Sequence, residues 1–480
     1  MFLQYDQNQS FLLPPSYKDF LWENHEAILL NEFIENLDTS KLVSLYEKNN
    51  KWRPKYHPVL LLKVLFYGYM TQTFSSRKIA HRLKSDIWFM FLAANNKPDF
   101  RTINRFRKDQ LATIQWLFTQ VVLLAKKLWL VTFGAVNLDW TKIYANASKS
   151  QSYDLERITK ISQKLVEEAQ KIDELEDKEF WDDDWSSIPE HLKTKEWRDQ
   201  KLKEIAKEQK NLAEIKQIVE SEIEIKKEQG INQSRINLTD TDARLMQMKR
   251  KDWWVWYNPQ NITENQIILT TNVSNSAEDT WELVPILTKF NEEFWVYPCQ
   301  QVADTWYASE KNYKFLEEHH IESFVPHQEQ QINLAEYVCN QETNTYIDKN
   351  WHVYQFKQNC LYPWKWKKWR PKKGVIIDTK DIQSTIYETV LPDGTKKYVS
   401  ISHNWHELCK RNDERLYSTD WKEIYRKRSW CVEAVFWNIK SNLWFEKFRL
   451  RGFDGATIER NIICLIHNIK KLRKSGYSLA

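Results

Sequence analysis

Glycine is scarce in this chain, and its scarcity limits where the backbone can turn. Among 480 residues there are 8 Gly and 24 Trp. Glycine takes positive φ at little cost, whereas a bulky side chain such as that of Trp does so only under strain. Ordinary glycine usage is about 7%. The two residue types together account for 6.7% of this chain, so the combined total resembles ordinary glycine usage with little Trp added.

The remaining composition is that of a folded intracellular protein. The chain is 42% apolar and 28% charged, which excludes a disordered, collagen-like or disulfide-stapled class and allows two or three domains. Six cysteines form no CxxC pair, so reduced thiols are expected. The N-terminus lacks the order of a signal peptide, and no apolar run approaches the roughly 18 residues of a membrane span. We therefore expect a soluble cytoplasmic protein with no membrane partner.

Charge is distributed unevenly along the sequence. Residues 51–110 contain 13 Lys or Arg against 3 Asp or Glu, whereas residues 151–230 contain 15 against 22. A basic segment that includes aromatic residues favours a polyanionic partner, most often nucleic acid. The alternative is a solvated helical surface with no partner.

The first 130 residues show helical periodicity, with two short basic helices predicted near 75–83 and 101–111. Two such helices across a linker fit a helix-turn-helix-like DNA reader. An ordinary helical bundle with basic surfaces is the alternative. The candidate DNA-binding residues of this region are Arg77, Lys78, Arg101, Arg105 and Arg107.

The pattern changes to α/β beyond residue 130. A buried strand is predicted over 131–139, and apolar runs over 266–273 and 294–304 are read as further strands. A helix over 309–319 and a strand over 321–326 complete a β-α-β unit. Residues 153–230 are charged and helical with a break near 181–189, which predicts an inserted helical hairpin. Residues 340–420 read as irregular, and 429–474 as helical.

Three carboxylates stand where two-metal phosphoryl transfer would need them. Asp139 and Asp304 each end a predicted strand, and Glu433 lies on a predicted helix. Oxygen ligands suit Mg²⁺ or Mn²⁺, and two such ions can activate an attacking oxygen and stabilise a leaving one. Lys440 follows Glu433 by seven residues, which predicts a shared helix face. The alternative is that each aspartate caps a helix or forms a turn.

The strings around these carboxylates resemble those of insertion-sequence DDE transposases. Residues 138–147, LDWTKIYANA, resemble the family's first-aspartate motif D-G-T-K-I-x-A-N-A. Residues 302–313, VADTWYASEKNY, resemble the second, A-D-x-G-Y-x-S-x-x-N. Tyr425, Arg428, Glu433 and Lys440 resemble the signature around the catalytic glutamate, although the Arg-to-Glu spacing is one residue longer than in many relatives. Residues 448–452 and 467–472 continue the similarity.

The resemblance implies a fold, a division into domains and a function. The fold class would be α/β, a ribonuclease-H-like mixed sheet flanked by helices. Residues 1–130 would form the helical DNA-binding domain, 131–150 and 231–480 the catalytic domain, and 151–230 the inserted charged hairpin. The protein would cleave DNA at terminal inverted repeats and transfer the strand to target DNA, with two Mg²⁺ or Mn²⁺ ions held by Asp139, Asp304 and Glu433.

The resemblance also implies partners. Arg428 and Lys440 would contact phosphate near the cut, and a homodimer would pair two DNA ends in the bacterial cytoplasm, at the nucleoid. Two alternatives remain open: an inactive or domesticated DNA-binding protein, and a nuclease of the same fold that does not transfer strands.

Several tryptophans stand where relatives usually carry glycine. They are Trp52, Trp140, Trp256, Trp281, Trp306, Trp437 and Trp444. We hypothesise that UGA codons that mean Gly in the source organism are written here as Trp. If the tryptophans are genuine, Trp140 and Trp306 would crowd the metal site.

Overall fold

The computed structural model describes most of the chain. The described residues are 17, 22, 24–47, 56–181, 195–228, 233–247, 252–327, 338–340, 343–348, 350–360, 384–391, 394–416 and 421–475. Within them, no helix is both long enough and apolar enough to cross a membrane.

The N-terminal region is helical, as predicted. Its helices are α2 (Glu26–Glu35), α3 (Ser40–Glu47), α4 (Pro58–Met70), α5 (Ser76–Ser85), α6 (Ile87–Leu92), α7 (Phe100–Asp109) and α8 (Leu111–Lys127). Helix α7 begins where the Asp99 side chain accepts a hydrogen bond from the Thr102 amide, 2.7 Å away. Helix α6 was not predicted. It lies between the two basic helices, so their connection contains a helix and is not the short turn of a simple helix-turn-helix.

The central sheet combines antiparallel and parallel strands. They are β1 (Ala135–Trp140), β6 (Trp253–Glu264), β7 (Ile267–Ser274), β8 (Gln300–Val302) and β9 (Glu322–Phe324), in the order β7-β6-β1-β8-β9. The β7-β6 and β6-β1 pairs are antiparallel, whereas β1-β8 and β8-β9 are parallel. Two short strands, β2 (Ile143–Tyr144) and β5 (Arg244–Gln247), pair with the first half of β6. The α/β class is therefore confirmed.

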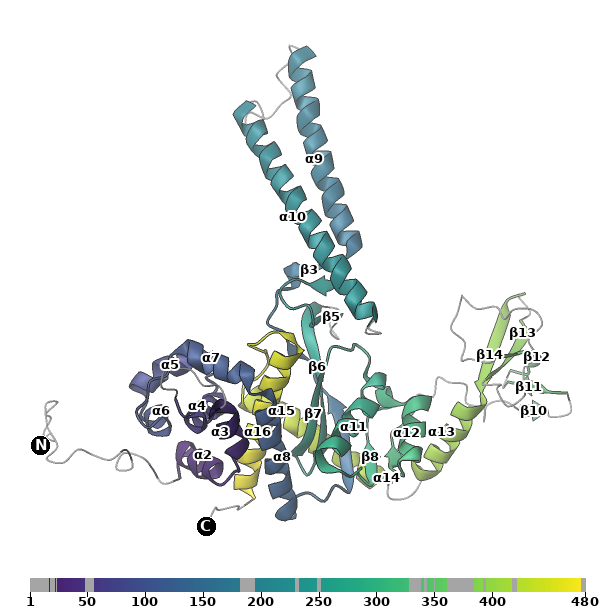
Figure 1. The fold of residues 1–480 in the computed structure, drawn as a ribbon. Coiled ribbons are helices and arrows are strands. Elements are labelled where there is room, and N and C mark those ends of the chain that lie inside the picture. The colour runs from purple at the N-terminus through teal and green to yellow at the C-terminus, as the bar shows by residue number, and fades with distance from the viewer. Residues whose placement is uncertain are drawn as a thin grey trace, which may run out of the picture.

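Helix α16 (Gly452–Lys474) joins the helical region to the sheet. It packs against α8 and α4 on one side and against β7 on the other (Figure 1). Helices α11 (Leu283–Phe294) and α12 (Glu310–Glu318) also pack beside the sheet strands. Most of α16 is buried, and one apolar cluster runs continuously from the N-terminal helices through the sheet. The N-terminal helices and the sheet therefore share a core.

A long helical hairpin projects from this body (Figure 1). Helices α9 (Leu155–Trp181) and α10 (Lys195–Glu228) pack along their length through residues spaced by seven. These are Ile158, Leu165 and Ile172 on α9, and Ile205, Leu212 and Val219 on α10. That spacing is the heptad repeat of a coiled coil. The strands β3 (Ser152–Tyr153) and β4 (Ile236–Asn237) pair at its base.

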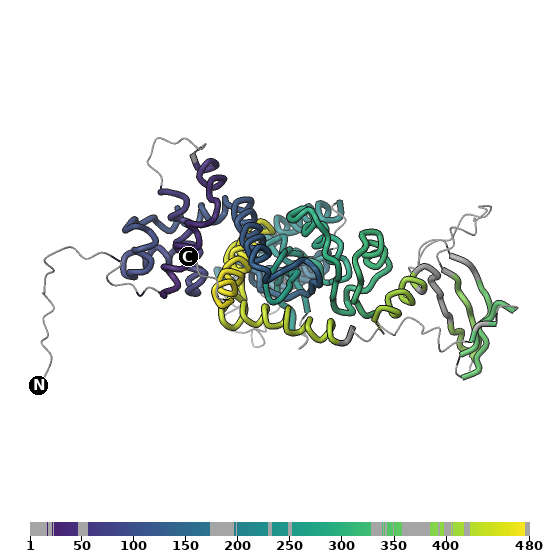
Figure 2. Tube along the Cα trace, turned by 90° about the horizontal axis from the view of Figure 1, so that it is seen from below, coloured from purple at the N-terminus to yellow at the C-terminus, as the bar shows by residue number. Residues whose placement is uncertain are grey.

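A second sheet was not predicted. Strands β10 (Val338–Asn340), β11 (Thr345–Ile347), β12 (Val353–Cys360), β13 (Ser384–Val390) and β14 (Lys396–Ser402) form an antiparallel meander, followed by α13 (His403–Leu416) and α14 (Trp421–Arg428). This sheet lies at the end of the molecule opposite the N-terminal helices (Figure 2). Strands β10 and β11 have only three residues each, which gives little periodicity to recognise. The turn between β13 and β14 contains Gly394 at φ 79°.

The expected strand over 294–304 was also wrong in part. Helix α11 continues to Phe294, and only residues 300–302 pair as a strand. Trp295 stops the helix because its backbone is left-handed, at φ 60° and ψ 26°. That is the conformation of a helix C-cap, which glycine normally provides.

Four tryptophans occupy the left-handed region among the described residues: Trp129, Trp295, Trp351 and Trp444, with φ between 54° and 62°. Their side chains are between 68% and 90% exposed, so no packing compensates the strain. Trp444 is in the glycine-like set named above, and the other three are additional. Trp256, by contrast, is buried and stacks on Tyr144 with ring centroids 3.7 Å apart. Trp52 lies outside the described residues. Of the glycine-like set, Trp140, Trp256, Trp281, Trp306 and Trp437 do not have a positive φ. The backbone therefore supports the glycine hypothesis at Trp444 and at three positions outside the set.

Replacing Trp129, Trp295 and Trp444 together with Gly should stabilise the protein. Relief of left-handed strain is worth roughly 1 kcal/mol at each position after the entropy that glycine loses on folding is subtracted. The midpoint of thermal unfolding should rise. As a control, Trp116→Gly makes the same chemical change inside helix α8, where Trp116 packs against the core, and it should lower the midpoint. Equal effects of the two variants would contradict the prediction.

Candidate active site

Asp139 and Asp304 lie at matching ends of two neighbouring strands. Strands β1 and β8 are parallel, and Asn137 pairs with Val302. Each aspartate follows its paired residue by two positions. Carboxyl ends of parallel strands meet at one edge of a sheet, where sites are often built. Two residues 165 positions apart in the sequence are thus brought together by strand pairing.

The guanidinium group of Arg428 joins the two aspartates. Its Nη2 atom lies 2.9 Å from Oδ2 of Asp139 and 3.7 Å from Oδ2 of Asp304. Arg428 is the last residue of α14, and it is 9% exposed. Asp139 also accepts a hydrogen bond from the Trp140 amide at 2.9 Å, and Asp304 accepts one from the Thr305 amide at 2.7 Å. Both carboxylates therefore reach the same cation.

The surroundings of Asp139 change the pKa of its carboxyl group. Burial raises the pKa of Asp139 to about 6, while Arg428 and the Trp140 amide act in the opposite direction. The charges of Asp304 and Glu433 raise this pKa further, which shows that the three carboxylates are electrostatic neighbours. Shifts of this kind, from burial and like charges at one place, are typical of functional sites.

Glu433 lies on a π-helical turn that contacts β1 and β6 near Asp139. Residues Ser429–Glu433 form the turn, which follows α14 directly and leads into α15 (Ala434–Trp437). A π turn carries one extra residue per hydrogen-bonded loop. The Glu433 carboxylate is exposed and accepts a hydrogen bond from Ser429 Oγ at 2.9 Å.

Lys440 does not join the acidic cluster in this structure. It lies in a second π-helical segment, Asn438–Asn442. Burial lowers the pKa of Lys440, and the nearby charges that affect this pKa are those of Arg460 and Glu446. Because π turns hold more than 3.6 residues, a spacing of seven no longer returns to the same face. The predicted shared face with Glu433 is therefore not formed.

The donor chemistry fits a hard divalent cation, although the side chains are not arranged around one. Among the described residues, no three His, Cys, Asp or Glu side chains are grouped closely enough to hold an ion. However, Asp139 and Asp304 both approach the positively charged guanidinium group of Arg428. The atoms that they would offer to a metal ion are carboxylate oxygens, which suit a hard divalent cation. Arg428 instead contacts both aspartates, and the Glu433 carboxylate accepts its hydrogen bond from Ser429.

A buried polar network lies beneath the aspartates, and the sequence analysis did not identify it. Tyr307, in the 3₁₀ turn after Asp304, donates to Gln260 on β6. Gln260 and Asn258 donate to the Asp279 carboxylate at 3.4 and 2.8 Å. Burial raises the pKa of Asp279. The network connects the Asp304 loop to β6, the strand beside Asp139, and no local sequence pattern distinguishes these residues.

His467 anchors the segment that carries Glu433 and Lys440. Its Nδ1 atom lies 2.8 Å from Asn438 Nδ2, and its Nε2 atom lies 2.9 Å from the Gln266 carbonyl oxygen. Both contacts suit a neutral ring, with Nε2–H donating and Nδ1 accepting. Burial lowers the pKa of His467 to about 4.

Acid should weaken the fold through His467. A histidine whose pKa is lowered in the folded state binds a proton less readily there than in the unfolded state. Its contribution to stability is therefore complete at pH values above the ordinary pKa of about 6.5, and it is lost as the pH falls toward 4. Between pH 7 and pH 4.5 the loss should be roughly 2–3 kcal/mol. Urea unfolding at both pH values, compared with His467→Gln, measures this loss. A wild-type and a variant curve that fall in parallel would refute it.

The candidate DNA-binding residues of the N-terminal region divide into two groups. Arg77, Lys78, Arg101 and Arg105 are exposed on α5 and α7. The Arg77 and Arg101 guanidinium groups both lie over the Phe100 ring, at 5.1 and 5.7 Å from its centroid. These four residues, which we term the α5/α7 basic surface, are available to a polyanion.

Arg107 differs from this prediction because it is buried. Its guanidinium donates to Glu459 Oε1 at 3.2 Å, to the Tyr69 hydroxyl at 3.1 Å and to the Phe74 carbonyl oxygen at 3.0 Å. Ile103 and Phe106 share its buried side of α7. A residue on the apolar side of an amphipathic helix faces the core even when it is charged. Arg107 is therefore a structural residue.

Two models of protein families match the chain. Residues 15–109 match a transposase domain (DUF772), and residues 389–473 match a transposase DDE domain. The chain is related to the DDE transposases. No curated protein matches it.

The two matched segments of the chain contact each other. The first contains Tyr69 and Arg107, and the second contains Glu459, which accepts hydrogen bonds from both side chains. Arg428, Glu433 and Lys440 lie within the second match, whereas Asp139 and Asp304 lie outside both. A DDE domain belongs to a nucleic-acid-modifying enzyme, so this class applies to the chain.

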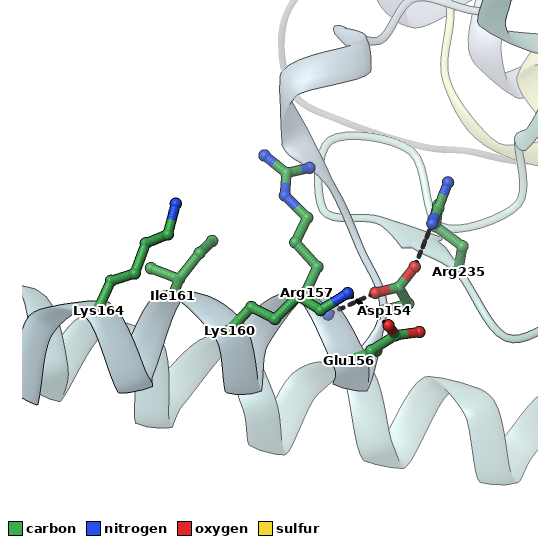
Figure 3. Close-up of a pocket in the computed structure, with 7 residues that line it drawn as sticks. All are labelled: Asp154, Glu156, Arg157, Lys160, Ile161, Lys164 and Arg235. Atoms are coloured by element: carbon green, nitrogen blue, oxygen red, sulfur yellow. Dashed lines mark hydrogen bonds and ion pairs between the residues drawn. The ribbon is translucent and has the colours of Figure 1, made fainter.

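A surface pocket at the base of the hairpin is separate from the DDE candidates. It is lined by Asp154, Glu156, Arg157, Lys160, Ile161, Lys164 and Arg235 (Figure 3). Asp154 accepts from Arg235 Nε and from the Arg157 amide, each at 2.7 Å. Lys160 pairs with Glu156 at 2.5 Å. The Asp154–Arg235 contact joins the start of α9 to the residue before β4. Most of the charges in the pocket are already paired.

Proposed function

We propose that this protein is a DDE transposase that cleaves DNA at the terminal inverted repeats of its insertion sequence and transfers the strand to target DNA. The observation that carries the proposal is the convergence of Asp139 and Asp304 on one cation, with Glu433 as an electrostatic neighbour. We infer a ribonuclease-H-like core, which the strand order β7-β6-β1-β8-β9 supports. We also propose the domain division 1–130, 131–150 with 231–480, and 151–230.

The residues of the site would divide the work between metal binding and phosphate binding. Asp139, Asp304 and Glu433 would hold two Mg²⁺ or Mn²⁺ ions. When bound, these ions supply Lewis-acid stabilisation of the charge on the attacking and leaving oxygens. Arg428 and Lys440 would contact phosphate oxygens near the cut, with Arg428 able to do so in a bidentate manner. The freed 3′-hydroxyl would then be positioned for in-line attack on target DNA.

The α5/α7 basic surface would bind the DNA end. Four exposed cations on two short helices provide the electrostatic attraction that dominates protein–DNA affinity. Transposition joins two DNA ends, so a homodimer is expected in the active complex. Because phosphate contacts release counterions, binding to inverted-repeat DNA should weaken steeply as salt increases.

Product analysis tests the function and separates it from its alternatives. The full chain is incubated with inverted-repeat DNA, target plasmid and Mg²⁺, and the products are sequenced across each junction. Joined ends support a transposase. Cleavage without joining would indicate a nuclease of the same fold, and binding without cleavage would indicate a non-catalytic DNA-binding copy.

A further inference from the structure

Arg428 occupies the position to which the two catalytic aspartates point. A single guanidinium nitrogen lies within 4 Å of carboxylate oxygens from both Asp139 and Asp304. Two carboxylates at the ends of neighbouring strands repel each other unless a positive charge stands between them. Arg428 provides that charge here.

The surroundings of Arg428 leave one hydrogen-bond donor of its side chain without a partner. The Nε atom is buried and has no hydrogen-bond partner. A buried donor without a partner costs free energy. The guanidinium lies over the Tyr425 ring, 6.0 Å from its centroid. Arg428 is therefore held in the site mainly through Asp139 and Asp304, and not through a complete set of partners of its own.

The backbone next to Arg428 is a place where a change of position is feasible. Helix α14 ends at Arg428, and the π-helical turn of Ser429–Glu433 begins at the next residue. Short π segments are less favourable than α-helix and are frequent at functional sites. The same turn carries Glu433, so a rearrangement that releases Arg428 can also release Glu433 from Ser429.

We propose that Arg428 and the catalytic metal ions compete for Asp139 and Asp304, so that the ions bind tightly only after Arg428 has turned toward a DNA phosphate. This inference rests on the proposed function. It gives the protein a safeguard: without DNA, the acidic pair is neutralised by its own arginine. With DNA, phosphate oxygens offer the guanidinium an equivalent charge-assisted partner and the aspartates become available.

Calorimetric titration of the DNA-free full chain with Mn²⁺ tests this competition. Arg428→Gln removes the internal cation, and its Mn²⁺ affinity should be at least about tenfold higher than that of the wild type, because charge-assisted contacts are worth at least that factor. Lys427→Gln is the matched control, since Lys427 is exposed and pairs with Glu423 at 3.0 Å. Its affinity should equal that of the wild type.

Equal Mn²⁺ affinity of the wild type and Arg428→Gln would overturn the proposal, as would an equal increase in Lys427→Gln. Thermal unfolding confirms that each variant is folded. If Arg428→Gln does not fold, Arg428→Lys keeps the charge but replaces the planar guanidinium, whose Nη2 atom contacts both carboxylates, with a compact ammonium on a more flexible stem. Its affinity should lie above that of the wild type, and an unchanged value would overturn the proposal equally.

A double variant separates this inference from the proposed function. Adding Asp139→Asn to Arg428→Gln should remove most of the Mn²⁺ binding. If binding persists, the acidic site is not the metal site and the proposed function fails. If binding is lost but Arg428→Gln alone binds like the wild type, only the competition fails. DNA-end duplex should tighten Mn²⁺ binding to the wild type more than to Arg428→Gln, and an equal gain in both would contradict the release of Arg428.

Discussion

Asp139→Asn should reduce strand cleavage at a DNA end by at least about a thousandfold. The substitution keeps the shape of the side chain but removes the charge that a divalent cation requires. Metal stabilisation of the reacting oxygens is worth several kcal/mol, and about 4 kcal/mol corresponds to that factor in rate. Asp139 is the one carboxylate on β1, so no other side chain of that strand can take its place.

Binding of the DNA end should survive Asp139→Asn because the α5/α7 basic surface lies on other elements. Cleavage is followed on a labelled inverted-repeat duplex, and binding by gel mobility shift. Asp454→Asn is the matched control, since Asp454 is exposed in the first turn of α16, and it should cleave normally. Cleavage by Asp139→Asn at the wild-type rate would remove Asp139 from the active site.

Arg107→Met should destabilise the folded protein by roughly 3–5 kcal/mol. Glu459 is fully buried, and Arg107 is the cation that pairs with it, at 3.2 Å. Removing one partner of a buried pair leaves an uncompensated charge, which costs about that amount. The loss should be large because the pair connects α7 to α16, within the core shared by the helical region and the sheet.

Arg105→Met, two residues away on the same helix, should leave stability nearly unchanged and weaken DNA binding. Arg105 is exposed on the same helix, so its loss should change stability by no more than about 0.5 kcal/mol. It should instead weaken DNA binding and reduce its salt dependence. Denaturant unfolding and DNA titration of both variants are needed. Equal stability of the two variants would show that the Arg107–Glu459 contact contributes little to the folded state.

Local sequence pattern was sufficient for those elements that are defined by their own periodicity. The N-terminal helices and the heptad-spaced hairpin were predicted because each buries one stripe of its surface. The strand that contains Asp139 was predicted because it is a buried, largely apolar run. The apolar run over 294–304 placed Asp304 at the end of a strand, and the strand found there, β8, ends two residues before it. The sheet of β10–β14 was missed because its strands are stabilised by pairing with their neighbours, which a single segment does not reveal.

Burial and convergence were decided only by the tertiary structure. Composition indicated too little glycine for a chain of this length, but only backbone angles distinguish the strained Trp295 from the well-packed Trp256. The sequence marked Arg107 and Arg428 alike as basic candidates. One is turned inward to Glu459, and the other is held between two aspartates. Periodicity reports on neighbours along the chain, whereas the partner of a buried charge depends on residues hundreds of positions away.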